Sequence, residues 1–342
     1  MIIVKAPLRI SIGGGGTDLP SYYEHFESTF ISAAINKYIY ISVHPIFIDD
    51  IILKYSEMER VKSSSEIKHP IVREALKMTG INSALEISSF ADIPSGTGLG
   101  SSGTFTVSLL KALYTFKNIN HNNMSLAEDA CRIEIEKLGA PIGKQDQYIS
   151  AVGGLTRFHI NKEGQVSANP LEMDRHSRID LEEHLLLFFT GYSRSANDLL
   201  REQDQKTKEA KPAGREISSE VSLNKPNNEM IENLHFTKEL GLKIGTALEK
   251  GKLSEFGSLM NTHWEYKKKR SKSMSTGRID EWYNIGMNNG ALGGKLIGAG
   301  GGGFLMFLAE DKRRLRRAMR EAGLQDVPFR FDQLGAQVVL HD

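Results

Sequence analysis

Glycines are concentrated at three places in this 342-residue sequence, and the stretch PSGTGLGSSG at 94–103 constrains the fold most strongly. Four of its ten residues are glycine, and the residues after it, TFTVSLLKALYTF, are typical of a helix. A glycine-rich loop that ends at a helix N-terminus aims unpaired backbone N–H groups and the positive end of the helix dipole at one point. The stretch therefore predicts an anion-binding loop, in which Ser101 and Ser102 either cap the helix or bind Mg²⁺.

Two common nucleotide-binding loops fit the sequence poorly. Gly98, Gly100 and Gly103 spell G-x-G-x-x-G, but a dinucleotide fold also needs a second strand and an acidic residue about 20 positions later. The first acid after Gly103 is Glu128, in another helical segment with no strand between. The segment GAPIGKQ at 139–145 lacks the Lys-Ser/Thr pair of a P-loop. A dinucleotide oxidoreductase and a P-loop protein are both disfavoured.

The other two glycine clusters lie near the ends of the chain, in ISIGGGGTD at 10–18 and KLIGAGGGGF at 295–304. Each follows an apolar segment, and glycine at such a place lets a ligand approach the backbone closely. Three clusters, one near each end and one in the middle, predict a ligand site between two lobes.

Composition limits the classes of partner. The chain has 43 Lys and Arg against 42 Asp and Glu, so charge gives no reason to expect nucleic acid or an anionic membrane as a partner. Cys131 is the single cysteine, which excludes an intramolecular disulfide and a cysteine-based zinc cluster. The sequence shows no signal peptide and no apolar run of 18 residues. We expect a cytoplasmic protein with a small-molecule partner.

Hydrophobic periodicity predicts alternating strands and helices in two domains, 1–180 and 181–342. Predicted strands cover 2–12, 30–48, 84–90, 184–192 and 304–309. Predicted helices cover 103–116, 125–138, 229–250, 253–270 and 279–289. Ser125 and Glu128 form a capping box at the start of the second helix.

Two segments are rich in charged or polar residues. The first has two interpretations, and the second has one. The polar stretch 202–229 is either a mobile lid or an exposed, broken helix. The basic stretch 312–323 carries Leu315, Ala318, Met319 and Ala322 at helical spacing, so it predicts a surface helix with solvated arginines.

The glycine clusters carry a family resemblance. In order, APLRISIGGGGTD (6–18), PSGTGLGSSG (94–103) and KLIGAGGGGF (295–304) resemble the three motifs of the GHMP kinases, the family of galactokinase, homoserine kinase, mevalonate kinase and phosphomevalonate kinase. The motifs span almost the whole chain. The resemblance implies an α+β fold of two lobes, the first like domain 2 of ribosomal protein S5 and the second ferredoxin-like. It also implies ATP and Mg²⁺ as cofactors.

The resemblance assigns the middle motif to the ATP phosphates, through Pro94, Gly96, Gly98, Gly100, Ser101, Ser102 and Gly103. Ser102 corresponds to a serine that binds Mg²⁺ in the family, and Glu134 to the second protein ligand of that ion. Independently of the family, Glu134 shares an apolar helix face with Ala127 and Cys131. A carboxylate on such a face needs a partner, which is either a metal or a Lys or Arg.

Two further residues correspond to the catalytic pair of the family. Asp146 in GKQDQYIS matches the active-site aspartate, which either accepts the proton of the attacking hydroxyl or orients it. Arg9 in APLRIS matches the basic residue beside that aspartate. A fixed positive charge there keeps a carboxylate ionised and stabilises charge on the transferred phosphoryl group.

The first motif points to the acceptor. Asp18 corresponds to the sugar-binding aspartate of galactokinase, but Gly15 and Gly16 replace the Glu and His of that enzyme, which argues against galactose. The form GGGGTDLP with a following Tyr resembles the heptose and fucose branch of the family. Chain length then favours D-glycero-D-manno-heptose 7-phosphate, because the bifunctional fucose enzymes are much longer.

A sugar phosphate needs a cationic pocket at its far end. Arg194 in TGYSRSAND resembles a family pattern and is one candidate; the run 267–270 is another, although it also reads as a solvated helix face. Gly300, Gly301 and Gly302 are expected to face the site of phosphoryl transfer.

The resemblance thus implies an ATP-dependent sugar 1-kinase that forms a heptose 1,7-bisphosphate for surface polysaccharide synthesis. A fucokinase-like or other sugar kinase, and a non-catalytic sensor of the same fold, remain alternatives. A homodimer is compatible with the sequence, which does not specify the oligomer.

Overall fold

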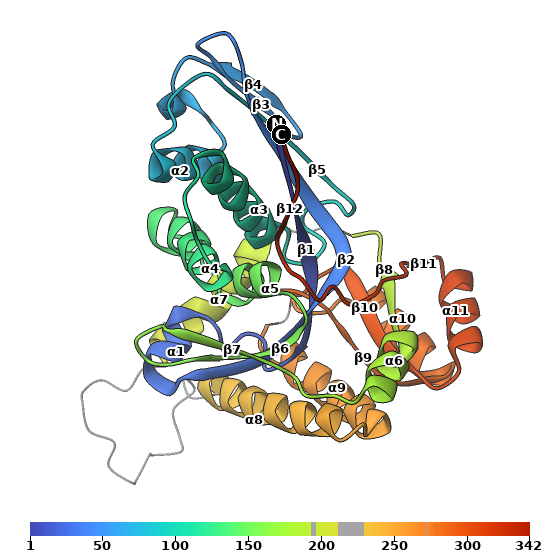
Figure 1. Cartoon of the computed structure of the whole chain (residues 1–342). Helices are drawn as coiled ribbons and strands as arrows, with labels where there is room; N and C mark the ends of the chain where they lie inside the picture. The colour runs from blue at the N-terminus through green and yellow to red at the C-terminus, as the bar shows by residue number, and fades with distance from the viewer. Residues whose placement is uncertain (193–195, 211–228, 272) are drawn as a thin grey trace.

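The computed structural model describes residues 1–192, 196–210, 229–271 and 273–342. These residues form two lobes, each a β-sheet with its own helices (Figure 1). The expected α+β architecture is confirmed.

The larger lobe is built on an eight-stranded sheet whose main path runs β12-β1-β2-β5-β3-β4, with β6 on β2 and β7 on β6. β3 and β5 run parallel, and the other pairs of this sheet run antiparallel. The long strands β1 and β2 form its centre because their apolar residues are buried almost without interruption. The strands are β1 (Ile2–Gly13), β2 (Ser28–Pro45), β3 (Ile51–Lys54), β4 (Met58–Val61), β5 (Leu85–Ala91), β6 (Leu155–Ile160), β7 (Val166–Pro170) and β12 (Gln337–His341).

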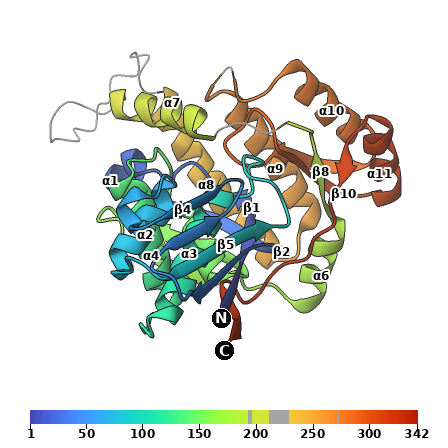
Figure 2. The same ribbon diagram turned by 90° about the horizontal axis from the view of Figure 1, so that it is seen from above.

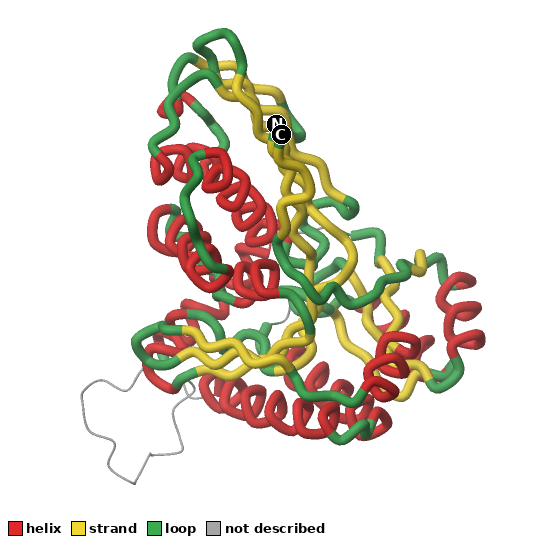
Figure 3. The backbone as a smooth tube through the Cα atoms, in the orientation of Figure 1, coloured by secondary structure: helices red, strands yellow, loops and turns green. Residues whose placement is uncertain are grey.

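Helices cover one face of this sheet, as the red coils beside the yellow strands of Figure 3 show. The longest, α3, begins at Ser101 within the middle glycine motif and packs on β1 and β2. The helical segments of this lobe are α1 (Pro20–Phe26), η1 (Ser64–Glu66), α2 (Pro70–Thr79), α3 (Ser101–Phe116), α4 (Asn123–Cys131), η2 (Arg132–Lys137) and α5 (Gln145–Val152).

The predicted start of the helix at Ser125 is wrong. The helix begins at Asn123, and Asn122 caps it: the Asn122 side chain accepts from Ser125 N at 2.8 Å, and Ser125 Oγ accepts from Asn122 N at 3.2 Å. An asparagine cap satisfies the first backbone donors as well as serine does, so the box sits three residues earlier. The helix then continues as the π-helical turn η2.

The smaller lobe has a four-stranded sheet in the order β11-β8-β10-β9. Its core joins the sheet to three helices through Phe188, Phe307, Trp264, Ile279 and Leu315. The elements are α6 (Arg175–His184), β8 (Leu185–Phe189), α9 (Leu253–Lys268), α10 (Gly277–Asn288), β9 (Ala291–Leu296), β10 (Phe304–Ala309), α11 (Lys312–Glu321) and β11 (Gln325–Asp326). The predicted surface helix is α11, which buries Leu315 and Met319.

Two more helices, α7 (Ala196–Glu209) and α8 (Glu229–Glu249), precede and follow residues 211–228 in the sequence. α8 packs against β1, β2 and α9, and α7 contacts α1 and α8 (Figure 2). The first part of the stretch 202–229 is therefore an ordered helix, because Gln203 and Thr207 are buried on its inner face; residues 211–228 lie outside the described part. No helix in the described ranges is long and apolar enough to span a bilayer.

The chain returns to the larger lobe at its end. β12 pairs antiparallel with β1, and Asp342 N donates to Met1 O at 3.1 Å, so the two ends lie side by side (Figure 1). The second half of the chain therefore contributes one strand to the first sheet. The division at residue 180 stays a prediction.

Candidate active site

A cavity of about 1110 Å³ lies between the lobes, and residues of all three glycine motifs line it. The first motif contributes Arg9, Gly15, Gly16 and Asp18; the middle motif Pro94, Gly96, Gly98, Gly100, Ser101, Ser102 and Gly103; the third Gly298, Gly300 and Gly302. Glu134 and Asp146 also line it. Segments almost 300 residues apart thus meet at one site, as their composition predicted.

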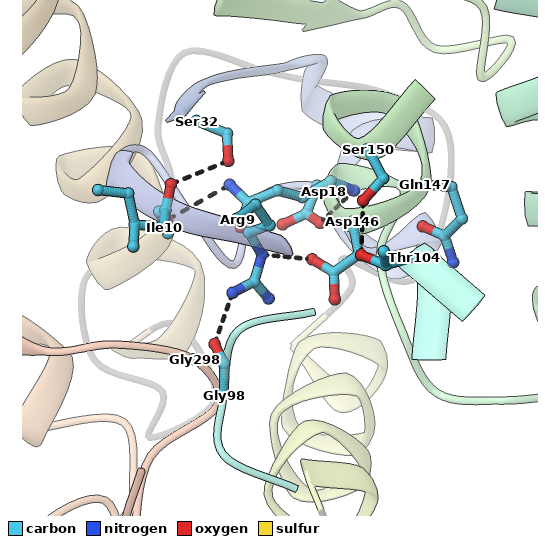
Figure 4. Close-up of polar contacts among 12 residues, drawn as sticks. Arg9, Ile10, Asp18, Ser32, Gly98, Thr104, Asp146, Gln147, Ser150 and Gly298 are labelled. Atoms are coloured by element: carbon cyan, nitrogen blue, oxygen red, sulfur yellow. Dashed lines mark hydrogen bonds and ion pairs between the residues drawn. The ribbon is translucent and has the colours of Figure 1, made fainter. Parts of the chain in front are cut away.

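The middle and third motifs touch at Gly98 and Gly298, which are close together in Figure 4. A Cβ on Gly298 would lie 2.5 Å from Gly98 Cα, and both residues have positive φ, +83° and +77°. Any side chain at position 298 would push the two loops apart. Glycine is therefore required where the larger lobe meets the smaller one.

Arg9 and Asp146 form an ion pair at the centre of the cavity (Figure 4). Arg9 Nε donates to Asp146 Oδ1 at 2.7 Å, and Arg9 Nη1 donates to Gly98 O at 2.5 Å. Arg9 is a buried residue of β1, and Asp146 occupies the first turn of α5. The arginine thus fixes the carboxylate against the phosphate-binding loop, in a bond between two charged groups.

Ser102 and Glu134 meet beside the same loop. Ser102 Oγ donates to Glu134 Oε2, and Gln147 Nε2 donates to Glu134 Oε1 at 2.9 Å. Burial raises the pKa of Glu134, while the hydrogen bonds from Ser102 and Gln147 oppose that shift. Glu134 is held by neutral donors, so the alternative of a Lys or Arg partner is not found among the described residues.

The donor set of this pair fits Mg²⁺. A serine hydroxyl and a carboxylate are hard oxygen ligands, and Mg²⁺ in phosphoryl-transfer sites takes one or two protein ligands together with phosphate and water. In the described part of the chain, no group of three or more His, Cys, Asp or Glu could hold a metal. Ser101 Oγ is buried without a hydrogen-bond partner among the described residues, and Ser101 lines the same cavity.

Asp18 is buried and lines the cavity. Its carboxylate accepts from Gly16 N at 3.0 Å and from Gln145 N at 3.2 Å. Burial, and then the charge of Asp146, raise the pKa of Asp18, whereas the backbone donors lower it. Two carboxylates that face one pocket provide acceptors for several hydroxyl groups.

The third motif supplies backbone to the cavity wall. Gly300 and Gly302 line the cavity; Gly301 is not among its lining residues, and its N–H donates to Met274 O at 3.0 Å. Arg194 lies outside the described residues.

The basic run 267–270 splits into two pairs. Lys267 and Arg270 are buried and line the cavity, whereas Lys268 pairs with Glu265 at 2.9 Å and Lys269 lies over the Tyr266 ring at 4.2 Å. The interpretation as a solvated helix face holds for the second pair. The signal that separates them is in the sequence, because His263 and Lys267 follow the i, i+4 spacing of one buried face of α9, and Arg270, in the turn just after the helix, continues that spacing.

Sequence reasoning missed several lining residues. Tyr55, His69 and Phe105 bring aromatic rings to the end of the cavity near β3, α2 and α3, with the His69 and Phe105 rings stacked at 5.1 Å. Lys295 of β9, the first residue of the third glycine motif, is buried and lines the cavity, and Arg201 and Gln203 come from α7. The aromatics and the α7 residues carry no local pattern, and only the fold brings them to the cavity.

Comparison with known families agrees with this geometry. Residues 67–154 match the GHMP kinases N terminal domain, and residues 246–325 match the GHMP kinases C terminal domain. The first match includes the middle glycine motif with Glu134 and Asp146, and the second includes the third glycine motif.

Individual relatives extend the likeness to the whole chain. The chain is 29% identical to a D-glycero-alpha-D-manno-heptose 7-phosphate kinase of Campylobacter jejuni over 96% of both sequences. It is 27% identical to a bifunctional fucokinase/GDP-fucose pyrophosphorylase of Arabidopsis thaliana, over 78% of this chain and 25% of that protein. A crystal structure of a D-glycero-D-manno-heptose 1-phosphate kinase from Bacteroides thetaiotaomicron superposes with a TM-score of 0.80, at 25% identity and full coverage of both chains. This chain is an ATP-dependent phosphotransferase and belongs to the GHMP kinase family.

Proposed function

We propose that this enzyme transfers the γ-phosphoryl group of ATP to the anomeric hydroxyl of D-glycero-D-manno-heptose 7-phosphate. The observation that carries the proposal is the position of the Arg9–Asp146 pair, between the glycine loop at 94–103 and the pocket of Asp18. A donor phosphate on one side and a sugar on the other would meet at this pair.

Asp146 is suited to receive the proton of the attacking hydroxyl. Its Oδ1 accepts from Arg9, while its Oδ2 accepts no hydrogen bond from the residues that the structure describes. The free oxygen can therefore accept from a substrate hydroxyl and draw its proton away as the bond to phosphorus forms. The guanidinium of Arg9 pairs with the other oxygen of the carboxylate and lies beside the loop where charge develops.

The donor side of the site is built for a triphosphate. The N-terminus of α3 and the loop N–H groups favour bound phosphate, and Ser101 and Ser102 add hydroxyls in the first turn. Ser102 and Glu134 would hold Mg²⁺, which neutralises phosphate charge when bound. The aromatic wall of Tyr55, His69 and Phe105 offers an apolar surface for the adenine ring.

The acceptor is proposed from the relatives and from the first motif. The named relatives include a heptose 7-phosphate kinase and a heptose 1-phosphate kinase, so their names agree on a phosphorylated heptose and differ on the phosphate position. Asp18 would accept ring hydroxyls in the pocket that Gly15 and Gly16 leave open. The product would supply a cytoplasmic route to nucleotide-activated heptose for surface polysaccharide.

The test is product analysis by ³¹P NMR with ATP, Mg²⁺ and one acceptor at a time: heptose 7-phosphate, the unphosphorylated heptose, L-fucose, D-galactose and mevalonate. We expect the heptose phosphate to have the highest kcat/KM, with a new anomeric phosphate resonance. Faster turnover of fucose or of the free heptose would contradict the proposal. Absence of turnover with every acceptor, together with saturable ATP binding, would favour the sensor.

A further inference from the structure

Three buried basic side chains in the wall of the cavity have no carboxylate partner among the described residues. Lys267, Arg270 and Lys295 are 8%, 4% and 2% exposed, and none forms an ion pair with a carboxylate of the described residues. Buried charges are costly unless an opposite charge compensates them. Their burial without a counter-charge lowers the stability of the folded protein, and a bound anion would remove this destabilisation.

The protein uses only part of the donor capacity of these groups. Arg270 donates to three neutral acceptors: Asn233 Oδ1 at 2.9 Å, Thr237 Oγ1 at 2.7 Å and Gly15 O at 3.2 Å. A guanidinium carries five N–H donors, so a fork remains for a ligand.

The two lysines behave in the same way. Lys267 donates to Leu296 O at 3.0 Å and to Gly298 O, and Lys295 donates to Ile12 O at 2.8 Å and contacts His263 Nδ1 at 3.1 Å. Burial, and then the neighbouring Arg270, lower the pKa of Lys267 to about 7. Each ammonium group has three donors, so each retains one. These lysines would hold their charge more firmly with an anion beside them.

The cations lie on the acceptor side of the site. Arg270 contacts the first glycine motif. Burial lowers the pKa of Arg270, and the charge of the nearby Asp18 opposes part of that shift. The middle motif, by contrast, has its own phosphate donors in the N-terminus of α3, Ser101 and Ser102. An anion bound at Arg270 would therefore belong to the molecule that Asp18 holds.

The position of the Arg270 guanidinium depends on the absence of a side chain at Gly16. A Cβ on Gly16 would lie 2.4 Å from Arg270 Nη1, and Gly16 has φ +98°. A side chain at this position would displace the guanidinium. The glycine that replaces a larger residue of galactokinase thus leaves the space in which a cation reaches the sugar pocket.

A fourth cation stands at the mouth of the cavity. Arg201 of α7 is exposed, lines the cavity and has no hydrogen-bond or ion-pair partner within the described ranges. Its helix is tied to the cation cluster, because Gln203 Nε2 donates to Gly16 O at 2.8 Å and Lys206 Nζ to Arg270 O at 3.2 Å. The carboxylate of the adjacent Glu202 is held by Lys206 and Ser271, so it does not neutralise Arg201.

We infer that Lys267 and Arg270, supported by Lys295 and extended by Arg201, bind a phosphate group carried by the acceptor substrate. This inference rests on the proposed function and deepens it, because it makes the enzyme selective for phosphorylated over free sugars. The phosphate that is recognised is the one already on the sugar, remote from the hydroxyl that reacts.

The kinetic test compares heptose 7-phosphate with the unphosphorylated heptose in Lys267→Met, Arg270→Gln and Arg201→Gln. We expect kcat/KM for the sugar phosphate to fall about 10- to 100-fold in the first two and about tenfold in the third, since each loses a charge-assisted hydrogen bond. The kcat/KM for the free heptose and the KM for ATP should change less than about threefold. Lys269→Met removes the same charge from the exposed face of the same helix and serves as the matched control.

A binding experiment separates this inference from the identity of the sugar. With saturating AMPPNP and Mg²⁺ in the phosphate-binding loop, inorganic phosphate should raise the Tm of the unaltered protein and of Lys269→Met, but not of Lys267→Met or Arg270→Gln. If the enzyme prefers another sugar phosphate, the proposed function fails while this result stands. Arg201→Gln changes an exposed side chain, so the kinetic comparison can still be made with this variant if Lys267→Met or Arg270→Gln does not fold.

Two results would overturn the inference. A parallel loss of activity on free and phosphorylated heptose would mean that the cations serve the transferred phosphoryl group. A Tm of the unaltered protein that does not respond to phosphate or to heptose 7-phosphate would mean that the cluster binds no acceptor phosphate.

Discussion

Arg9 Nε lies 2.7 Å from Asp146 Oδ1, although 137 positions separate the two residues in the chain. The pair joins the central strand β1 to the first turn of α5, and a second bond from Arg9 reaches Gly98 O. The strand, the helix and the phosphate-binding loop thus hold one carboxylate in a fixed place. Catalysis by positioning depends on such rigid supports.

Replacing Asp146 with Asn should lower kcat by about 10²- to 10⁴-fold and leave the KM for ATP nearly unchanged, because the amide cannot accept the proton. Steady-state kinetics with a coupled ADP assay measures both constants. Asp180→Asn alters an exposed aspartate of α6 and should behave as the unaltered enzyme. A loss of less than tenfold for Asp146→Asn would show that the carboxylate only orients the hydroxyl.

Ser102→Ala and Glu134→Gln should raise the Mg²⁺ concentration needed for half-maximal activity at least tenfold, because each removes an oxygen ligand. The measurement is a Mg²⁺ titration at fixed ATP. Glu136→Gln provides the control, since Glu136 is exposed on the same π-helical turn. Unchanged Mg²⁺ dependence in both variants would refute a metal role for the pair.

Gly298→Ala should separate the two glycine loops, because its Cβ would enter the space of Gly98 Cα at 2.5 Å. We expect a loss of about 1–3 kcal/mol in the free energy of unfolding and a strong fall in kcat/KM. Urea denaturation and kinetics report the two effects. Gly277→Ala is matched to it, since nothing lies within 4 Å of a Cβ at position 277; equal effects of the two substitutions would contradict the argument.

The buried Lys267 makes stability depend on pH. Its pKa of about 7 in the folded protein lies below the ordinary value of 10.5, so between these values the unfolded chain binds more protons. Without an anion, the free energy of unfolding relative to Lys267→Met should therefore increase with pH across this window, by about 1.4 kcal/mol per pH unit. Urea denaturation from pH 6 to 10 in phosphate-free buffer measures the difference. Parallel profiles, as expected for Lys269→Met against the unaltered protein, would exclude this charge effect.

The strands β1, β2, β5, β8 and β10, the longer helices and the three glycine motifs follow from the sequence because each is a local pattern. The shorter strands β3, β4, β6, β7, β9, β11 and β12 were not predicted. β1 and β10 are apolar runs of strand length, and α8 and α9 occupy the predicted helical stretches closely. The start of this helix was predicted at Ser125, whereas Asn122 caps it. Two polar residues three positions apart could both cap a helix, and packing decides between them.

The site was predictable where a motif marks it and not where the fold assembles it. Arg9, Ser102, Glu134 and Asp146 stand in or beside motifs, and the structure brings them to one cavity. Arg201 has ordinary surroundings in the sequence, so only tertiary contacts reveal it. Lys295 opens the third glycine motif, but the prediction there was confined to the glycines. Lys267 and Arg270 are an intermediate case. Helical spacing distinguishes them from Lys268 and Lys269, but their charge alone does not show which of the four residues are buried.

The pairing of β12 with β1 has a consequence for how the protein is made. During synthesis, β12 is made only after the strands and helices of the smaller lobe, so one edge of β1 stays unpaired until that lobe has been translated. Contacts of such long sequence separation close late and slowly. The larger lobe should therefore reach its final stability only after β12 has left the ribosome.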